Sequence, residues 1–295
     1  MGADGMAGEG MQREGIGEGR LSAHPEADIE VQLILEAIYQ LYHYDFRNYA
    51  PTSLRRRLRA AMQRFECPTL SHLQARLLRE PEVFRSVLRD LTVQVSEMFR
   101  DPEYFKALRE QVVPVLRTYP SLKLWVAGCS SGEEAYSMAI LMKEEGLLER
   151  TLIYATDISQ EALAQAEAGV YRIDLAPGFT ENHRLSGGKG SLSEHYTAAY
   201  DHILLDKSLK ERIVFSDHSL STDSVFAEVQ LVSCRNVLIY FNRALQDRAI
   251  GLFSEALCRH GFLGLGARET IRFSEHAGDF TEIAPHERIY QRRSK

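Results

Sequence analysis

The chain has 295 residues, of which 44% are hydrophobic and 26% are charged, and its formal net charge is −6. These values are typical of a soluble globular protein with one large or two ordinary domains, and the negative charge argues against a nucleic-acid-binding protein. No apolar run approaches the length of a membrane span, so direct membrane insertion is not expected.

The cysteines and the N-terminal segment bear on location. Cys67, Cys129, Cys234 and Cys258 form no C-x-x-C pair, which favours a reduced, cytoplasmic chain over a disulfide framework. Residues 1–26 are Gly-rich and polar, and they lack the basic start and apolar core of a secretory signal. This segment is therefore predicted to be disordered.

Apolar residues recur at helical spacing from residue 27 to residue 91 and predict a helical N-terminal domain. The first helix is expected to begin near Ala27 and the second near Thr52 or Ser53, which are suitable N-caps. Ser71 is expected to cap a third helix, and Pro81 to occupy the first position of a fourth.

The second of these helices is strongly basic. Its arginines are Arg55, Arg56, Arg57, Arg59 and Arg64, and only Glu66 lies nearby to balance them. An ordinary solvated face is one explanation, but the excess of charge favours a docking surface for an acidic partner.

Residues 92–120 are predicted to be a linker and a connecting helix. Asp101, Pro102 and Glu103 are a start signal for a helix that runs to about Arg117, which places Arg100 on a loop just before it. From residue 121 to residue 295 strands alternate with helices, so this part is predicted to be a separate α/β domain.

The stretch KLWVAGCSSGEE, residues 123–134, predicts a buried strand, a tight turn at Gly128 and Gly132, and a helix that begins at Glu133. A helix start of this kind usually binds phosphate, but Glu133 and Glu134 in its first turn would repel one. The G-x-G-x-x-G spacing typical of NAD binding is also missing. The turn therefore favours an adenosine ligand with positive charge, such as S-adenosylmethionine.

The second strand is predicted at residues 151–155, and Asp157 follows at its tip, where a carboxylate of a doubly wound sheet typically binds both hydroxyls of a ribose. The alternative is that Asp157 only caps the next helix. Residues 171–209 break the alternation and are predicted to be a small β insertion. Beyond it, the strand exit from Asp217 to Leu220 is expected beside the cofactor's base.

A central strand is predicted at residues 229–233, with polar Cys234, Arg235 and Asn236 at its carboxyl end, where such sheets bind ligands. A helix from residue 243 to residue 259 is expected to end before Gly261, and residues 262–267 and 288–293 are expected to be closing strands. The predicted fold is a doubly wound, Rossmann-like α/β domain behind an all-α domain.

Four blocks of this sequence, in order, are similar to those of one family. They are VQVSEMFRDPEYF, AGCSSGEEAYS, YATDIS followed by Tyr171 and Arg172, and CRNVLIYF. From about residue 29 to residue 293 the chain resembles the chemotaxis-receptor glutamate methyltransferases, the CheR family.

The resemblance implies roles for specific residues. Arg100 and Tyr240 match the pair that flanks the transferred methyl group. The positions matching cofactor-binding residues are Gln94, Ser96, Arg100, Gly128, Glu133, Asp157, Ser219, Leu220, Cys234, Arg235 and Asn236. The chain departs from the family where it has Gln94, Ser96, Ser219 and Ala135, in place of Asn, Thr, Asn and Pro. It also has Ala-Arg268-Glu269 where the family has HSE, a change whose effect the sequence does not reveal.

The implied reaction is methyl transfer from S-adenosylmethionine to receptor glutamates, giving methyl esters and S-adenosylhomocysteine. A glutamate with a pKa of about 4.3 is ionised near pH 7, so no general base is required. No metal is expected, since the histidines show no H-E-x-x-H spacing. The expected partners are glutamate-rich receptor helices docked on Arg55, Arg56 and Arg59, in cytoplasmic receptor arrays, and a receptor's C-terminal tether peptide is a further candidate.

Two other functions stay open on the sequence. The changes at Gln94, Ser96 and Ser219 suit a non-catalytic cofactor-binding signalling module. A methyltransferase for another carboxylate substrate is the other alternative, although a small substrate would not need the basic helix.

Overall fold

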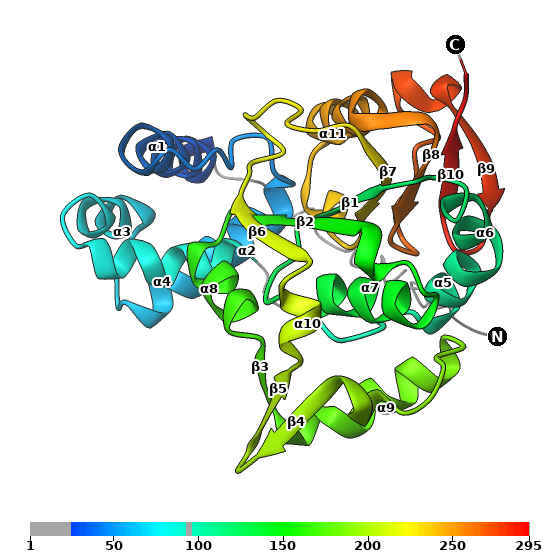
Figure 1. Ribbon diagram of the computed structural model, residues 1–295. Coiled ribbons are helices and arrows are strands. Elements are labelled where there is room, and N and C mark those ends of the chain that lie inside the picture. Colours follow the sequence, from blue (N-terminus) through cyan, green and yellow to red (C-terminus); the bar gives the residue numbers. More distant parts are fainter. Residues whose placement is uncertain (1–24, 93–95, 295) are drawn as a thin grey trace, which may run out of the picture.

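The structure is a computed structural model that describes residues 25–92 and 96–294. The predicted disordered segment falls almost wholly outside the described residues, and so does Gln94. Figure 1 shows a helical N-terminal part beside a sheet that carries helices on its faces.

The N-terminal part contains the helices α1 (Pro25–Tyr42), α2 (Pro51–Arg64), α3 (Leu70–Leu77) and α4 (Pro81–Leu91). Their apolar stripes meet in one core that includes Ile34, Leu58 and Val87, each fully buried. Two start positions differ from the prediction. Pro51 begins α2, because proline has no N–H to leave unpaired in the first turn, and Thr69 caps α3 by accepting a hydrogen bond from the His72 N–H.

The connecting helix consists of α5 (Pro102–Ala107), a wider π turn η1 (Leu108–Val112) and α6 (Val113–Leu116). The Val113 N–H donates to the Leu108 carbonyl, five residues back, as in a π-helix. Pro114 follows directly, and proline cannot supply the next hydrogen bond of an α-helix. The predicted extent of this helix is confirmed, while its wider turn was not predicted.

The main sheet has the strand order β6-β2-β1-β7-β8-β10-β9. The neighbouring strands β6, β2, β1, β7 and β8 run parallel to one another. Strand β10 is antiparallel to both β8 and β9. Their bounds are β1 (Leu122–Ala127), β2 (Thr151–Asp157), β6 (Ile213–Asp217), β7 (Val229–Cys234), β8 (Leu257–Leu265), β9 (Phe280–Ala284) and β10 (Ile289–Arg292). This topology confirms the doubly wound α/β fold.

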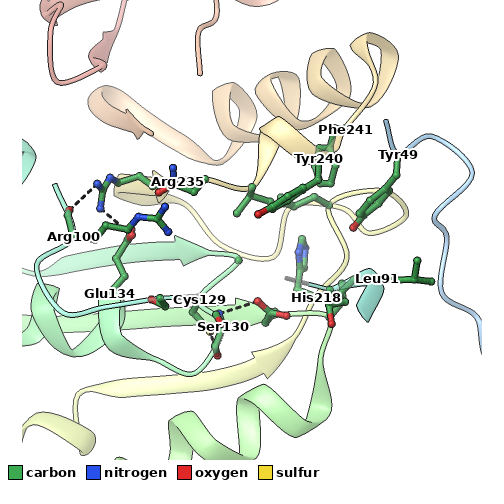
Figure 2. Close-up of a pocket in the computed structure, with 18 residues that line it drawn as sticks. Tyr49, Leu91, Arg100, Cys129, Ser130, Glu134, His218, Arg235, Tyr240 and Phe241 are labelled. Atoms are coloured by element: carbon green, nitrogen blue, oxygen red, sulfur yellow. Dashed lines mark hydrogen bonds and ion pairs between the residues drawn. The ribbon is translucent and has the colours of Figure 1, made fainter. Parts of the chain in front are cut away.

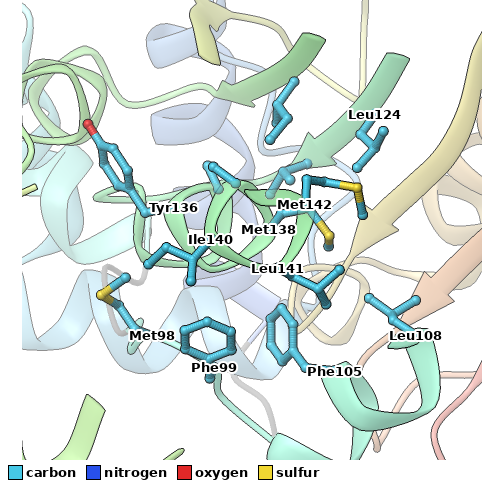
Figure 3. Close-up of a cluster of buried hydrophobic side chains, with 14 of the residues drawn as sticks. Met98, Phe99, Phe105, Leu108, Leu124, Tyr136, Met138, Ile140, Leu141 and Met142 are labelled. Carbon is cyan, nitrogen blue, oxygen red and sulfur yellow. The ribbon is translucent and has the colours of Figure 1, made fainter. Parts of the chain in front are cut away.

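Strand β1 separates two cores, since alternate side chains of a strand point to opposite faces. Leu124 and Val126 pack under α7 (Glu133–Glu144) and α8 (Gln160–Ala168), whereas Trp125 and Ala127 pack under α11 (Arg243–Ala256). Figure 3 shows the first core, where side chains of α7 lie against Phe105 of α5. Helices on both faces bury this parallel strand completely after its second residue.

The end of α11 corrects the predicted C-cap. The helix ends at Ala256, and Leu257 already begins β8. Gly261 lies within β8, where the pairing with β7 shifts register between Val229 and Leu231. A Cβ on Gly261 would come 3.0 Å from the Cys258 carbonyl oxygen, so this glycine serves an irregular strand and not a helix end.

The insertion is a three-stranded antiparallel sheet of β3 (Val170–Arg172), β5 (His202–Leu205) and β4 (Tyr196–Ala199), as expected. It also contains α9 (Ala176–Leu185) and is followed by α10 (Lys207–Lys210), neither of which was predicted.

The helical part contacts the sheet domain beside the carboxyl end of β7. The Ala50 N–H donates to the Tyr240 carbonyl over 2.7 Å, and the rings of Tyr49 and Phe241 pack edge to face. Arg57 is buried here, with its guanidinium carbon 4.8 Å from the centre of the Tyr240 ring and its Nη1 donating to the Leu91 carbonyl over 2.6 Å. These contacts close one side of a cavity.

Candidate cofactor and active site

A cavity of about 290 Å³ lies where β1, β2, β6 and β7 end, with Tyr49 and Leu91 of the helical part opposite (Figure 2). Ligands of doubly wound sheets bind at this edge. Most of the residues predicted to form the site line this cavity: Ser96, Arg100, Gly128, Asp157, Leu220, Arg235, Asn236 and Tyr240.

The turn after β1 forms the floor of the cavity. The N–H groups of Gly128 and Cys129 both donate to the Thr156 carbonyl, which ties the turn to the end of β2. Gly128 has a φ of 76°, and a Cβ there would come 2.4 Å from a Val237 methyl carbon. Only glycine allows the backbone to pass this close to the loop after β7.

Asp157 ends β2 and faces the cavity with both carboxylate oxygens held in place. Oδ2 accepts from the Ser130 N–H over 2.8 Å, and Oδ1 accepts from the Ser159 N–H over 2.9 Å. The cap of α8 is Ser159, whose Oγ accepts from the Ala162 N–H. Burial raises the pKa of Asp157, and the backbone N–H groups oppose that rise. Asp157 therefore does not serve as the cap, and its remaining lone pairs suit a diol.

The two acids that follow the turn take different positions. Glu133 is 4% exposed, accepts from the Ser131 hydroxyl and does not line the cavity. Burial raises the pKa of Glu133, against the effect of that hydrogen bond. Glu134 does line the cavity and accepts from Ser233 Oγ over 2.6 Å and from Arg235 over 3.2 Å. The predicted cofactor role of Glu133 stays a prediction.

Arg235 connects the carboxyl end of β7 to the linker segment that carries Arg100 and Asp101. Its Nη2 donates to the Asp101 carboxylate over 2.6 Å and to the Arg100 carbonyl over 2.8 Å, and its guanidinium carbon lies 4.3 Å from the centre of the Tyr104 ring. Figure 2 shows Arg100, Glu134 and Arg235 together at one end of the cavity. Arg235 thus fixes the loop that carries Arg100, and its predicted contact with the cofactor stays a prediction.

Glu269 is the one residue of the Ala-Arg268-Glu269 stretch that agrees with the family's HSE. Its carboxylate is buried and accepts from the N–H groups of Gly266 over 2.6 Å, Asn236 over 3.0 Å and Ile239 over 3.3 Å. Burial raises the pKa of Glu269, and these N–H groups oppose the rise. The acid braces the loop that carries Asn236 and Tyr240.

Two other residues predicted to bind the cofactor, Ser219 and Cys234, do not line the cavity. The Ser219 N–H donates to Asp223 and its hydroxyl contacts Ser221, and Ser219 does not line the cavity. Cys234 is fully buried outside the lining, and burial raises the pKa of its thiol, as it does for Cys129. Both cysteines are therefore poor nucleophiles.

The sequence did not identify every lining residue. Tyr49, Thr92, His218 and Phe241 also line the cavity. The position of His218 directly after β6 was a usable signal, because it lies within the strand exit assigned to the base. Tyr49 and Thr92 belong to the helical part, and only tertiary packing brings them to the sheet.

The cavity residues fit S-adenosylmethionine. A glycine turn that a Cβ would block, a carboxylate with lone pairs for a ribose, and apolar Ile158 and Leu220 nearby provide for a nucleoside. The described residues contain no group of His, Cys, Asp or Glu placed to hold a metal ion. In the same part of the chain no helix has the length and apolar character to cross a membrane.

Comparison with known families agrees with this geometry. Residues 94–287 match the model "CheR methyltransferase, SAM binding domain", and residues 29–92 match "CheR methyltransferase, all-alpha domain". The chain belongs to the CheR methyltransferase family. It is accordingly an S-adenosylmethionine-dependent methyltransferase of the family that includes the chemotaxis protein methyltransferases.

Similar CheR-family proteins come from several bacteria. The chain is 53% identical to the protein Cher3 of Pseudomonas putida, over 92% of this chain and 100% of that one. It is 29% identical to a chemotaxis protein methyltransferase of Listeria monocytogenes, over 77% of this chain and 84% of that one. It is 28% identical to chemotaxis protein methyltransferase 1 of Vibrio cholerae, over 74% of this chain and 80% of that one.

Proposed function

We propose that this CheR-family protein transfers the methyl group of S-adenosylmethionine to glutamate side chains of chemotaxis receptors, at the cytoplasmic receptor arrays. The supporting observation is that Arg100 and Tyr240 line the same cavity as the residues that fit a nucleoside. This cavity lies beside the basic helix α2. When bound, S-adenosylmethionine supplies an electrophilic methyl group, which a carboxylate oxygen accepts to form a methyl ester as S-adenosylhomocysteine departs.

The residues of this chain would act on the acceptor by binding and orientation. Arg100 is half-buried and offers charge-assisted hydrogen bonds to a carboxylate. Its backbone is fixed from both sides, because Arg235 donates to the Arg100 carbonyl and the Phe99 N–H donates to Ser137 Oγ over 2.8 Å. The Arg57 guanidinium packs over the Tyr240 ring, and the Ala50 N–H donates to the backbone carbonyl of Tyr240. Alignment of this kind can contribute about 7–11 kcal/mol to a reaction.

The basic helix would dock the substrate. Arg56 and Arg59 are exposed, and Arg55 is half-buried with an ion pair to Asp28. Arg57 points inward, so it does not belong to the docking surface. Glutamate-rich receptor helices carry the complementary charge.

The receptor's tether peptide is a second proposed partner. Strand β4 is an edge of the small sheet, and Thr197, Ala198 and Ala199 are exposed there. An extended peptide can add to such an edge by backbone hydrogen bonds.

The deciding experiment incubates the purified protein with methyl-labelled S-adenosylmethionine and receptor-containing membranes, and measures base-labile methyl ester on the receptor. Ester in the wild type and its loss in Tyr240→Phe, with S-adenosylhomocysteine still bound, would support the proposal, and Arg100→Ala should also lose the ester. Cofactor binding without ester would instead indicate a non-catalytic signalling module. Ester only on other acceptors would indicate a different carboxylate substrate.

A further inference from the structure

His218 lines the cavity, and only one of its two ring nitrogens has a hydrogen-bond partner among the described residues. The residue directly follows β6 and is 8% exposed. Figure 2 shows it among the side chains that line the cavity. Its Nε2 lies 3.1 Å from the Ser224 carbonyl oxygen, and a carbonyl can only accept, so Nε2 carries the proton. In a neutral imidazole Nδ1 then presents a lone pair. Within residues 25–92 and 96–294, this buried Nδ1 has no hydrogen-bond partner.

The ring is held in this orientation by its neighbours. Trp125 and Phe226 pack edge to face against it, with ring centres 5.3 Å and 5.2 Å away. The Trp125 Nε1–H donates to Thr156 Oγ1 and is therefore not directed at the imidazole. Because a buried acceptor without a donor is costly, the unpaired Nδ1 points to a donor that a ligand supplies.

The position of His218 in the sheet relates it to the predicted cofactor site. The His218 N–H donates to the Asp157 carbonyl over 3.3 Å, and Asp157 pairs with Asp217 in the β2–β6 register. His218 thus directly follows the strand that lies next to the one ending at Asp157, and it belongs to the strand exit expected beside the cofactor's base. The Asp217 carboxylate accepts from Gln160 and does not line the cavity, so it is not the acceptor on this side.

We propose that Nδ1 of His218 accepts a hydrogen bond from the exocyclic amino group of the cofactor's adenine, and so selects a 6-aminopurine over a 6-oxopurine. The proposal rests on S-adenosylmethionine binding in this cavity. A 6-oxopurine would place an acceptor oxygen opposite the Nδ1 lone pair. Moving the proton to Nδ1 would not relieve this, because Nε2 would then face the Ser224 carbonyl without a proton.

The test compares S-adenosylhomocysteine with S-inosylhomocysteine, its deaminated analogue, by calorimetry. The wild type is expected to prefer the amino compound by roughly tenfold to a hundredfold, the range for a buried polar group left unpaired. His218→Asn places an amide oxygen near the position of Nδ1 and should keep most of the preference. His218→Gln reaches the position of Nε2 without an acceptor at Nδ1 and should lose it. The proposal would be overturned if His218→Asn and His218→Gln preferred S-adenosylhomocysteine over S-inosylhomocysteine by the same factor.

A measurement on the unsubstituted protein does not depend on variants that fold. With ¹⁵N-labelled histidine, the Nδ1 resonance of His218 should shift on addition of S-adenosylhomocysteine and should not show that shift with S-inosylhomocysteine. An Nδ1 resonance that responds identically to the two compounds would overturn the proposal. Failure of the wild type to bind S-adenosylhomocysteine at all would instead contradict the proposed cofactor site.

Discussion

Asp157 has the most direct geometric case among the predicted ligand residues, since both its oxygens are oriented by backbone N–H groups at the cavity. We expect Asp157→Asn to weaken S-adenosylhomocysteine binding by about tenfold to a hundredfold, because the negative charge is lost and one of the two acceptor oxygens becomes an NH2 donor. Asp217→Asn, on the adjacent strand and outside the lining, is the matched control. Calorimetry of both variants measures the effect, and equal losses would remove the specific role of Asp157.

We expect the same residue to make cofactor binding depend on pH. The proposed hydrogen bonds to a ribose need the ionised carboxylate, so affinity should fall as the pH drops through the pKa of Asp157. Since burial raises that pKa above its ordinary value of 3.8, the loss should begin at a higher pH than for an unperturbed aspartate. In Asp157→Asn this pH dependence should disappear.

Glu133 and Glu134 carry the charge that first suggested a cationic ligand, and the structure separates them. Arg235 already balances the charge of Glu134 at 3.2 Å, whereas the hydrogen bonds to Glu133 come from uncharged groups, among them the hydroxyl of Ser131. We therefore expect Glu133→Gln to weaken S-adenosylhomocysteine binding by about tenfold and Glu134→Gln to weaken it less. Calorimetry that finds the reverse order would assign the cofactor's ammonium group to Glu134.

At the scale of elements, the carboxyl end of α7 anchors the insertion. Glu144 forms a buried ion pair with Arg109 and lies 2.6 Å from His183 Nε2 of α9 and 3.6 Å from His195 Nε2. Glu145 accepts from Arg109 over 3.0 Å and forms an ion pair with Lys189 over 2.9 Å. The last turn of one helix therefore holds α9 and the chain that leads into β4.

This anchor gives a stability prediction with a definite sign. Burial raises the pKa of Glu144, but hydrogen bonds from His183 and His195 and the charge of Arg109 outweigh burial, so the pKa lies well below the ordinary 4.5. A lowered folded-state pKa contributes stability above pH 4.5, and that stability is lost as the pH falls further. Glu144→Gln should lower the free energy of unfolding by about 3 kcal/mol near neutral pH.

Urea denaturation measures this difference at several pH values. The gap between the wild type and Glu144→Gln should narrow as the solution becomes acidic. Glu149→Gln is the control, because Glu149 has an 86% exposed side chain and an ion pair with Arg212 that should contribute little. A gap that widened towards acidic pH would contradict the assigned pKa shift.

At the scale of the molecule, α2 serves two surfaces. Its inner side buries Leu54, Arg57 and Leu58 against the rest of the protein, and its outer side exposes Arg56 and Arg59. Replacing Arg55, Arg56 and Arg59 together by Glu should strongly reduce receptor methylation and leave S-adenosylhomocysteine affinity unchanged. The expected reason is loss of charge complementarity with an acidic receptor helix, which should also make wild-type methylation sensitive to salt.

A matched control reverses the same number of charges elsewhere. Lys106, Lys123 and Arg259 are exposed on α5, β1 and β8, away from α2. Changing them together to Glu should leave methylation near the wild-type rate. Equal losses in the two triple variants would show a general effect of net charge and not a docking surface.

The sequence by itself predicted the fold and much of the site, because those features are local. The strand, glycine turn and acid-rich helix start of residues 123–134 lie within one stretch of chain, as does the strand that ends at Asp157. The basic helix was equally visible from its composition. Such signals depend on neighbours a few residues apart, so periodicity and turn chemistry reveal them.

Only the tertiary structure decided which side chains face the cavity. Glu133 and Glu134 are adjacent in sequence, yet packing buries one beneath the turn and turns the other towards Arg235, a residue far along the chain. Likewise the Arg57 side chain points inward to contact Leu91 and Tyr240, and His218 has one nitrogen with a hydrogen-bond partner and one buried nitrogen without a partner among the described residues. These distinctions depend on contacts between distant segments, which local sequence patterns do not encode.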